Sequence, residues 1–164
     1  MQKIIVIGCP GSGKSVFSRA LHERTGIPLF HLDLMYWNSD RTAADSAVFQ
    51  ERLAYALRQP AWIIDGNYMR SLALRMQACD TVFFLDYPTA VCLSGARERR
   101  GKPRPDMPWT ETADAEDPAF LTFIQDFRAQ RRPEILALLE QFTGRDIHIF
   151  ENRDAADAFL MHLA

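Results

Sequence analysis

Gly8 to Ser15 has the pattern G-x-x-x-x-G-K-S, which is typical of a phosphate-binding loop. Its glycines allow tight turns and close approach to an anion, and the helix that follows offers N–H groups and a positive dipole end. We expect Lys14 to reach the β- and γ-phosphates of a nucleotide and the Ser15 hydroxyl to bind Mg²⁺. The nucleotide-binding residues predicted here are Gly8, Pro10, Gly11, Ser12, Gly13, Lys14, Ser15 and Val16.

Two carboxylates follow apolar runs further along the chain. Asp33 ends the run 28–33 and Asp65 ends the run 61–65. Ligands of open α/β sheets bind at the carboxyl ends of the strands, so both side chains should lie near the phosphates. One of the two could hold Mg²⁺ through water, and the other could orient or deprotonate an acceptor hydroxyl. The alternative for each is a helix cap or an ordinary loop carboxylate.

Aromatic and polar side chains come directly after these carboxylates. Tyr36 and Trp37 are expected on a loop, where they could stack on a base or line an apolar pocket. Packing against a helix at 45–59 is the alternative. Asn67 and Tyr68 follow Asp65 and could contact the acceptor. We therefore include all four in the predicted substrate-binding set.

Arginines dominate the cations, with 16 Arg against three Lys. On a predicted helix 88–100, Arg97 and Arg100 share one face while Arg99 points elsewhere. On the next helix we expect Arg131 nearer the apolar stripe of Phe120, Ile124 and Phe127, and Arg132 on a face shared with Arg128. These groups flank the loop 101–117, which is long enough to be a lid. Lid arginines can close over a transferring phosphoryl group and neutralise its charge, so the predicted catalytic arginines are Arg97, Arg100, Arg131 and Arg132. A solvated charged face is the alternative.

The elements that must position these residues alternate between strand and helix. The predicted strands are 3–7, 28–33, 61–65, 80–86 and 146–150. The predicted helices are 13–26, 45–59, 88–100, 118–142 and 154–163, with a short helical piece between the third and fourth strands. We expect helix 118–142 to be kinked or broken at Pro133. This alternation predicts an α/β fold with a parallel sheet, covered by helices on both faces.

Length and composition restrict the possible classes of protein. The 164 residues suit one domain, 1–164, and the net charge of −2 gives no global basic surface for nucleic acid. Three cysteines argue against a disulfide framework. No apolar run approaches the ~20 residues that span a bilayer, and the first residues do not resemble a signal peptide. We expect a soluble cytoplasmic protein with no membrane partner, and four structural histidines.

Three further segments carry a resemblance to a known family. "FHLDLMYW", "WIIDGNY" and "DTVFFLDYP" resemble segments of small P-loop kinases. Nearly the whole chain is similar to the adenylate-kinase-related kinases called DNA topology modulation proteins. The resemblance implies a three-layer P-loop NTPase sandwich, with a five-stranded parallel sheet in the order 2-3-1-4-5 and a mobile lid.

The resemblance also assigns roles to individual residues. It implies that Asp65 is the metal-side carboxylate, that Asp33 contacts the acceptor, and that Arg100 and Arg132 belong to the lid machinery. It implies that Asn152 and Arg153 contact the adenine. The segment 38–43, "NSDRTA", departs from the family, whose members often carry another tryptophan there. The identity of the acceptor is therefore the property that transfers least well.

The predicted function is ATP-dependent phosphoryl transfer to a nucleotide, nucleoside or small hydroxyl metabolite, with ATP and Mg²⁺ as cofactors. The absence of an N-K-x-D string argues against a GTPase. One alternative is a nucleotide-binding regulatory protein that interacts with DNA without kinase turnover. The basic stretch 97–104 could bind DNA phosphates, although the negative net charge does not support it. A simple NTPase without a second substrate is the other alternative.

Overall fold

The fold is built on one sheet of five parallel strands, seen in a computed structural model that describes residues 1–112 and 116–163. The strands are β1 (Lys3–Gly8), β2 (Leu29–His31), β3 (Trp62–Asp65), β4 (Thr81–Leu85) and β5 (Asp146–Phe150). Their order is β2-β3-β1-β4-β5, and each neighbouring pair is parallel. The predicted α/β class and strand order are therefore confirmed.

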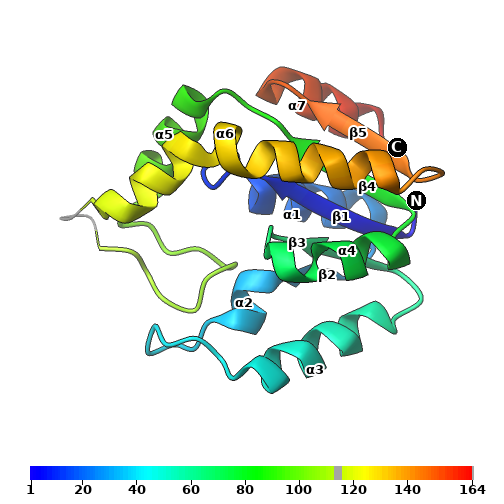
Figure 1. Ribbon diagram of the computed structural model, residues 1–164, viewed down its shortest axis with the longest axis horizontal. Coiled ribbons are helices and arrows are strands. Elements are labelled where there is room, and N and C mark those ends of the chain that lie inside the picture. The colour runs from blue at the N-terminus through cyan, green and yellow to red at the C-terminus, as the bar shows by residue number, and fades with distance from the viewer. Residues whose placement is uncertain (113–115, 164) are drawn as a thin grey trace.

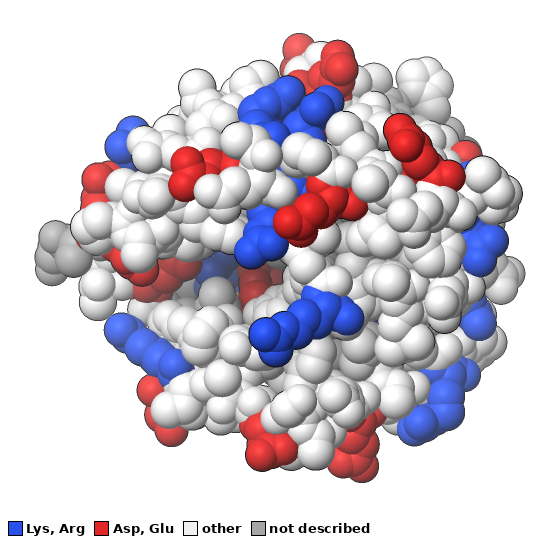
Figure 2. Space-filling model, in the orientation of Figure 1, with Lys and Arg blue, Asp and Glu red and all other residues white. Residues whose placement is uncertain are grey.

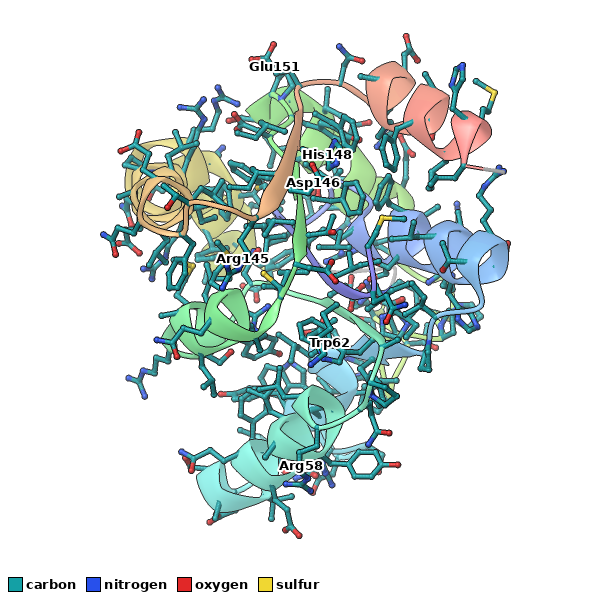
Figure 3. All side chains as sticks on the ribbon, turned by 90° about the vertical axis from the view of Figure 1, so that its right-hand side faces the viewer. Arg58, Trp62, Arg145, Asp146, His148 and Glu151 are labelled. Atoms are coloured by element: carbon teal, nitrogen blue, oxygen red, sulfur yellow. The ribbon has the colours of Figure 1, made fainter. Side chains whose placement is uncertain are left out.

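Helices cover both faces of this sheet. They are α1 (Lys14–Thr25), α2 (Leu32–Tyr36), α3 (Ser46–Leu57), α4 (Met69–Ala78), α5 (Thr89–Glu98), α6 (Pro118–Gln141) and α7 (Arg153–His162). Helices α1 and α7 lie against one face, whereas α4 and α6 lie against the other (Figure 1 and Figure 3). Helix α3 lies beyond the β2 edge. A sheet enclosed in this way needs strands that are apolar on both sides, as the runs of Ile, Val and Phe are.

The core is centred on the middle strands. The β1 side chains Ile4–Ile7 are fully buried, as are Phe83 and Phe84 of β4. Trp62, at the amino end of β3 (Figure 3), is also fully buried. Each such side chain contributes about 1.5–3 kcal/mol to stability through burial. The strands therefore give a rigid support to the loops that leave their carboxyl ends.

The helix boundaries follow local signals in the sequence. The Asp45 carboxylate accepts a hydrogen bond from the backbone N–H of Ala47 and caps α3. Gly26, with φ 69°, ends α1. Helix α6 continues through Pro133 as one helix, so the predicted break is absent, while the alternative of a kink stays a prediction. Proline removes one backbone donor, and the rest of a 24-residue helix outweighs that loss.

Two predicted elements end earlier than expected. Strand β2 ends at His31, and Leu32–Tyr36 form the short helix α2, so Asp33 and Tyr36 lie on a helix. Helix α5 ends at Glu98, which leaves Arg99 and Arg100 outside it. Residues 113–115 of the predicted lid lie outside the described residues. Within residues 1–112 and 116–163, no helix combines the length and apolar composition needed to cross a membrane.

Candidate active site

A cavity of 1110 Å³ opens at the carboxyl ends of the strands. Its walls include the phosphate-binding loop, the loop 66–68 after β3, the end of α5 and much of the segment 97–112. Figure 2 shows a hollow on the left of the face in view, with acidic and basic side chains inside it. Since open α/β sheets bind ligands at this end, the cavity is the candidate active site.

The phosphate-binding loop, residues 8–15, is fixed by close packing against α5. Gly11 has φ 83°, and a Cβ at this position would lie 1.9 Å from the carbonyl oxygen of Cys92. A Cβ at Gly95 would lie 2.1 Å from the carbonyl oxygen of Gly11. Only glycine fits at these two positions, so the loop and α5 hold each other in place.

Lys14 lies within this loop with its ammonium turned to the backbone. Its Nζ donates to the carbonyl oxygens of Gly8, at 2.9 Å, and Cys9, at 3.2 Å. Burial lowers the pKa of Lys14, while the charges of Asp33 and Asp65 oppose that shift. The predicted loop residues that line the cavity are Pro10, Gly11, Ser12, Gly13, Lys14, Ser15 and Val16.

Gly8 does not line the cavity and is instead held from behind by Asn67. The Asn67 Oδ1 accepts from the Gly8 N–H at 3.1 Å, and the Asn67 Nδ2 donates to the Gly8 carbonyl at 2.8 Å. The fully buried guanidinium of Arg75 donates to the carbonyl oxygens of Gly66 (2.9 Å) and Asn67. Asn67, which was predicted to contact the acceptor, does line the cavity. Its side-chain amide, however, is bonded to Gly8 of the phosphate-binding loop. The sequence analysis missed Arg75, because an arginine is typical of a surface position.

Asp33 and Tyr68, both predicted substrate-binding residues, meet at the wall of the cavity. The Tyr68 hydroxyl donates a 2.6 Å hydrogen bond to Asp33 Oδ1. Burial raises the pKa of Asp33, although the Tyr68 hydrogen bond and the Lys14 charge oppose the shift. Burial and the Asp33 charge raise the pKa of Tyr68 far above its ordinary value, so Tyr68 stays a proton donor in this bond. Asp33 is therefore a carboxylate of fixed orientation beside the phosphate-binding loop.

The two rings of the predicted aromatic pair contact each other edge to face at 4.8 Å, but only Trp37 lines the cavity. Tyr36 packs against Phe49 of α3, with ring centroids 5.9 Å apart, and is not among the residues that line the cavity. Trp37 does line it and meets Trp109 edge to face at 5.3 Å. Trp109 lies on an irregular segment, where no periodicity indicates which side chains face inward, so the sequence analysis missed it.

Asp65 lies behind the cavity wall. It is 3% exposed, its Oδ1 is 2.8 Å from Nδ1 of His31, and its Oδ2 has no hydrogen-bond partner among the described residues. Burial opposes protonation of His31, but the hydrogen bond and charge of Asp65 outweigh it and raise the pKa of the imidazole. From this depth the Asp65 carboxylate would act on a cation in the cavity through water.

Arg97 and Arg100 both line the cavity and share one carboxylate. Glu116 accepts from Arg97 Nε at 2.9 Å and from Arg100 Nη2 at 3.1 Å. The Arg97 and Glu116 side chains are 54% and 41% exposed. Each of these two predicted lid arginines therefore forms an ion pair with Glu116, and ion pairs at the surface are weak.

Arg99 and Arg104 form a second, more buried group in the same wall. Arg99 Nη2 lies 3.6 Å from Glu111 Oε1, and the Arg99 guanidinium lies 5.3 Å from the Phe120 ring centroid. Arg104 Nη2 donates to Glu111 at 3.0 Å. The expectation that Arg99 points elsewhere is wrong. It assumed helical geometry, and α5 ends one residue before Arg99.

Asp106 is a further buried residue of this wall that the sequence analysis missed. Its Oδ2 accepts a 3.0 Å hydrogen bond from the Ser15 hydroxyl of the phosphate-binding loop. Arg104 Nη1 lies 3.3 Å from Asp106 Oδ2, and Arg19 Nη1 lies 3.5 Å from its Oδ1. Despite burial, the Arg104 charge and the Ser15 hydrogen bond lower the pKa of Asp106, which is therefore ionised.

The α6 arginines lie outside the main cavity. Arg132 Nε donates to both carboxylate oxygens of Asp86, at 2.9 and 2.8 Å. Arg128 Nη1 also reaches Asp86, at 3.3 Å. Arg131 pairs with Glu134 at 3.2 Å on an exposed face. Neither Arg131 nor Arg132 lines the cavity, so their predicted catalytic role would require a rearrangement of α6.

The predicted adenine contacts, Asn152 and Arg153, lie at the start of α7. The Asn152 Oδ1 accepts from the Ala155 N–H at 2.9 Å and caps this helix. Asn152 and Arg132 line a second cavity, of 390 Å³. Arg153 lines the main cavity beside Gly95. The structure thus places only Arg153 of this pair at the large cavity.

Comparison with solved structures identifies the fold. No protein-family model and no curated protein matches the chain. Shikimate kinase from Bacteroides thetaiotaomicron superposes with a TM-score of 0.62 at 18% identity, covering 98% of this chain and 94% of that one. Shikimate kinase from Acinetobacter baumannii in complex with shikimate gives 0.62 at 19%, covering 98% and 89%. The Aquifex aeolicus enzyme gives 0.57 at 17%, covering 98% and 94%. The chain therefore has the fold of the shikimate kinases over almost its whole length.

Proposed function

We propose that this chain transfers the γ-phosphoryl group of ATP to a hydroxyl group of a small acceptor. One observation carries the proposal: Asp33, held by Tyr68, lines the same cavity as the phosphate-binding loop. A nucleotide-binding protein without an acceptor does not require such a carboxylate, whereas a kinase needs one to orient the acceptor hydroxyl. The fold shared with shikimate kinases, one of them solved with shikimate, supports this proposal.

The geometry suggests how the residues would act. The acceptor oxygen attacks the γ-phosphorus while Asp33 accepts its proton, and the bond from the γ-phosphorus to the bridging oxygen breaks to release ADP. Lys14 would turn from the backbone carbonyls to the β- and γ-phosphate oxygens and neutralise their charge. Ser15 would hold Mg²⁺, which when bound supplies further positive charge at these oxygens.

The lid side would complete the charge neutralisation. Among the described residues, Arg97 and Arg100 pair with Glu116, and ion pairs at the surface are weak enough to exchange for phosphate oxygens. Trp37 and Trp109 offer apolar ring surface to the acceptor. The acceptor class stays open among a nucleotide, a nucleoside and a small hydroxyl metabolite. The resemblance to topology modulation proteins also stays a prediction.

The test is ADP release from Mg·ATP across a panel of nucleoside monophosphates, nucleosides and small hydroxylated metabolites. We expect one acceptor class to stimulate ADP release strongly, and Lys14→Ala to reduce that rate by about 10³-fold through loss of phosphate neutralisation. The Lys14→Ala protein should keep its melting temperature, which separates loss of chemistry from loss of fold. Slow hydrolysis that no acceptor stimulates would contradict the proposal.

The DNA-binding alternative has little support in the structure. The basic stretch 97–104 is not a free cationic surface, because Glu116 and Glu111 pair with its arginines. The net charge of −2 also disfavours a polyanionic partner. Duplex binding with a steep salt dependence would revive this alternative.

A further inference from the structure

The segment 101–112 brings a carboxylate onto the phosphate-binding loop. Asp106 lies 91 positions from Ser15 in the sequence, yet the two side chains are joined by a 3.0 Å hydrogen bond. Asp106 is only 3% exposed. A buried carboxylate so close to the expected triphosphate would repel it, unless a cation lay between them.

We propose that Asp106 is a direct ligand of the divalent cation that accompanies the nucleotide, together with Ser15. Asp106 would thereby complete the cation's coordination when the nucleotide is bound. This inference rests on the proposed function, because the cation enters with the nucleotide. It assigns the metal site to Ser15 and Asp106, with Asp65 acting through water.

The distance between the two oxygens suits one ion. Magnesium binds oxygen ligands in an octahedron at about 2.0–2.1 Å, so adjacent ligands lie about 2.9 Å apart. Ser15 Oγ and Asp106 Oδ2 are 3.0 Å apart. One ion could therefore contact both oxygens with almost no movement of either side chain.

The donor set also fits an ion that is shared with a nucleotide. Among residues 1–112 and 116–163, no group of three or more His, Cys, Asp or Glu side chains could hold a metal by itself. Magnesium commonly takes one or two carboxylates and fills its remaining positions with phosphate oxygens and water. Besides burial, the charges of Asp65 and Asp106 raise the pKa of Asp33, so the three carboxylates are close enough to interact.

Asp106 does not occupy the position of a phosphate group. A carboxylate that imitated phosphate would take the donors of the phosphate-binding loop. Lys14 donates to the carbonyl oxygens of Gly8 and Cys9, and in the described part of the chain no N–H of the loop donates to Asp106. Asp106 contacts the loop through the Ser15 hydroxyl, which is the group that binds the metal in such loops.

Two arginines balance the Asp106 charge in the protein without ligand. Arg104 lies at 3.3 Å and Arg19 at 3.5 Å from the Asp106 carboxylate, and the Arg19 side chain is partly exposed. Arginine binds phosphate oxygens at least as well as carboxylates, so both could move to the nucleotide as it enters. The cation would then take over the neutralisation of Asp106.

The experiment measures Mn²⁺ binding by electron paramagnetic resonance, with a non-hydrolysable ATP analogue present. We expect Asp106→Asn to weaken Mn²⁺ binding to the protein–nucleotide complex by about 10- to 100-fold. The affinity of the analogue in the presence of EDTA should not fall. Glu111→Gln is the matched control, because it removes the same charge and an Arg104 partner but does not contact Ser15. It should leave Mn²⁺ binding within about twofold of the parent.

A second variant excludes a purely structural effect. Asp106→Cys should shift the metal preference of the complex from Mg²⁺ towards Cd²⁺ by at least tenfold relative to the parent, because thiolate favours softer ions. Mn²⁺ binding by Asp106→Asn within twofold of the parent would overturn the inference and leave the proposed function in place. The inference would also be overturned if Asp106→Asn bound the analogue more tightly than the parent by the same factor at every metal concentration. Asp106 would then oppose nucleotide binding and would not be a metal ligand. A parent protein that binds no nucleotide would overturn both proposals.

Discussion

The two walls of the cavity are held by opposite kinds of interaction. The loop wall, residues 8–15 and 66–68, is fixed by hydrogen bonds to the backbone, half-buried ones between Asn67 and Gly8 and a buried one from Arg75 to the Gly66 carbonyl. The lid wall, residues 97–112 and 116–120, is held mainly by ion pairs between side chains, several of them exposed.

This difference separates the part of the site that is preorganised from the part that can respond to a ligand. A buried backbone group that loses its partner costs about 1–3 kcal/mol, which makes the loop wall difficult to rearrange. An exposed ion pair contributes about 0.2–1 kcal/mol, so the Glu116 pairs of the lid wall can exchange partners at low cost. We therefore expect changes at Asp33 and at Arg75, which supports the loop wall, to affect rate or folding strongly, and changes in the Glu116 ion pairs to affect them weakly.

Asp33→Asn should have the largest effect on activity among these changes. It keeps an acceptor for the Tyr68 hydroxyl but removes the proton-accepting carboxylate, so the rate of ADP formation should fall by about 10²- to 10⁴-fold. The parent rate should also fall as the pH drops through the raised Asp33 pKa, and the variant should lack this dependence. Steady-state rates at several pH values measure both effects.

The same variant should not be less stable. The raised pKa of Asp33 means that the folded state holds the proton more tightly than the unfolded chain does. The ionised Asp33 carboxylate therefore lowers the free energy of unfolding. This loss develops as the pH rises from the ordinary pKa of 3.8 through the raised pKa of the folded state. At neutral pH, Asp33→Asn should unfold at the same or a higher urea concentration. Asp45→Asn, at an exposed cap, is the control and should change neither quantity. A large loss of stability in Asp33→Asn would contradict this account.

Arg75→Met should have the largest effect on folding. It leaves the buried carbonyls of Gly66 and Asn67 without their donor, at a cost of about 2–4 kcal/mol in the free energy of unfolding. Arg145→Met is the matched control. Arg145 (Figure 3) also donates to two carbonyls, those of Met76 and Gln77, but from a half-buried position. Its loss should cost less than about 1 kcal/mol, because water can replace the donor. Equal midpoints for the two variants in urea unfolding would show that burial does not set the strength of the loop wall.

The contrast between the walls also explains which parts of the site were predictable. The phosphate-binding loop is a contiguous pattern whose glycines are required by local backbone geometry, as at Gly11. Asp33 and Asp65 could be inferred because strand ends gather at one edge of a parallel sheet. The lid wall offers no such rule. Asp106 and Trp109 lie on irregular backbone, where side-chain direction depends on tertiary contacts, and Arg99 follows the end of α5.

Tertiary contacts also changed the environment of several predicted residues. Tyr36 and Trp37 are neighbours in sequence, yet the end of α2 turns one towards α3 and the other towards the cavity. Arg132 was grouped with the lid by its position along α6, but Asp86 holds it at a separate, smaller cavity. Sequence spacing predicts which element carries a residue. It does not predict the side chain on another element that the residue contacts, such as Phe49 for Tyr36 or Asp86 for Arg132.

Glu116→Gln should have the smallest effect, and it tests the claim that the lid wall exchanges its partners easily. The variant removes the carboxylate shared by Arg97 and Arg100, and should lower the free energy of unfolding by about 0.2–1 kcal/mol. The freed arginines should bind an ATP analogue as tightly as the parent does, or more tightly. Urea unfolding and titration calorimetry measure the two quantities.

Glu134→Gln is the control for this variant, since it breaks the exposed pair with Arg131 outside the cavity. It should change stability by a similarly small amount and leave nucleotide affinity unaltered. If Glu116→Gln instead lost more than about 2 kcal/mol, the exposed ion pairs would be a structural element comparable to the buried bonds of Arg75. The two walls would then be equally fixed, and nucleotide would have to enter a lid that is already rigid.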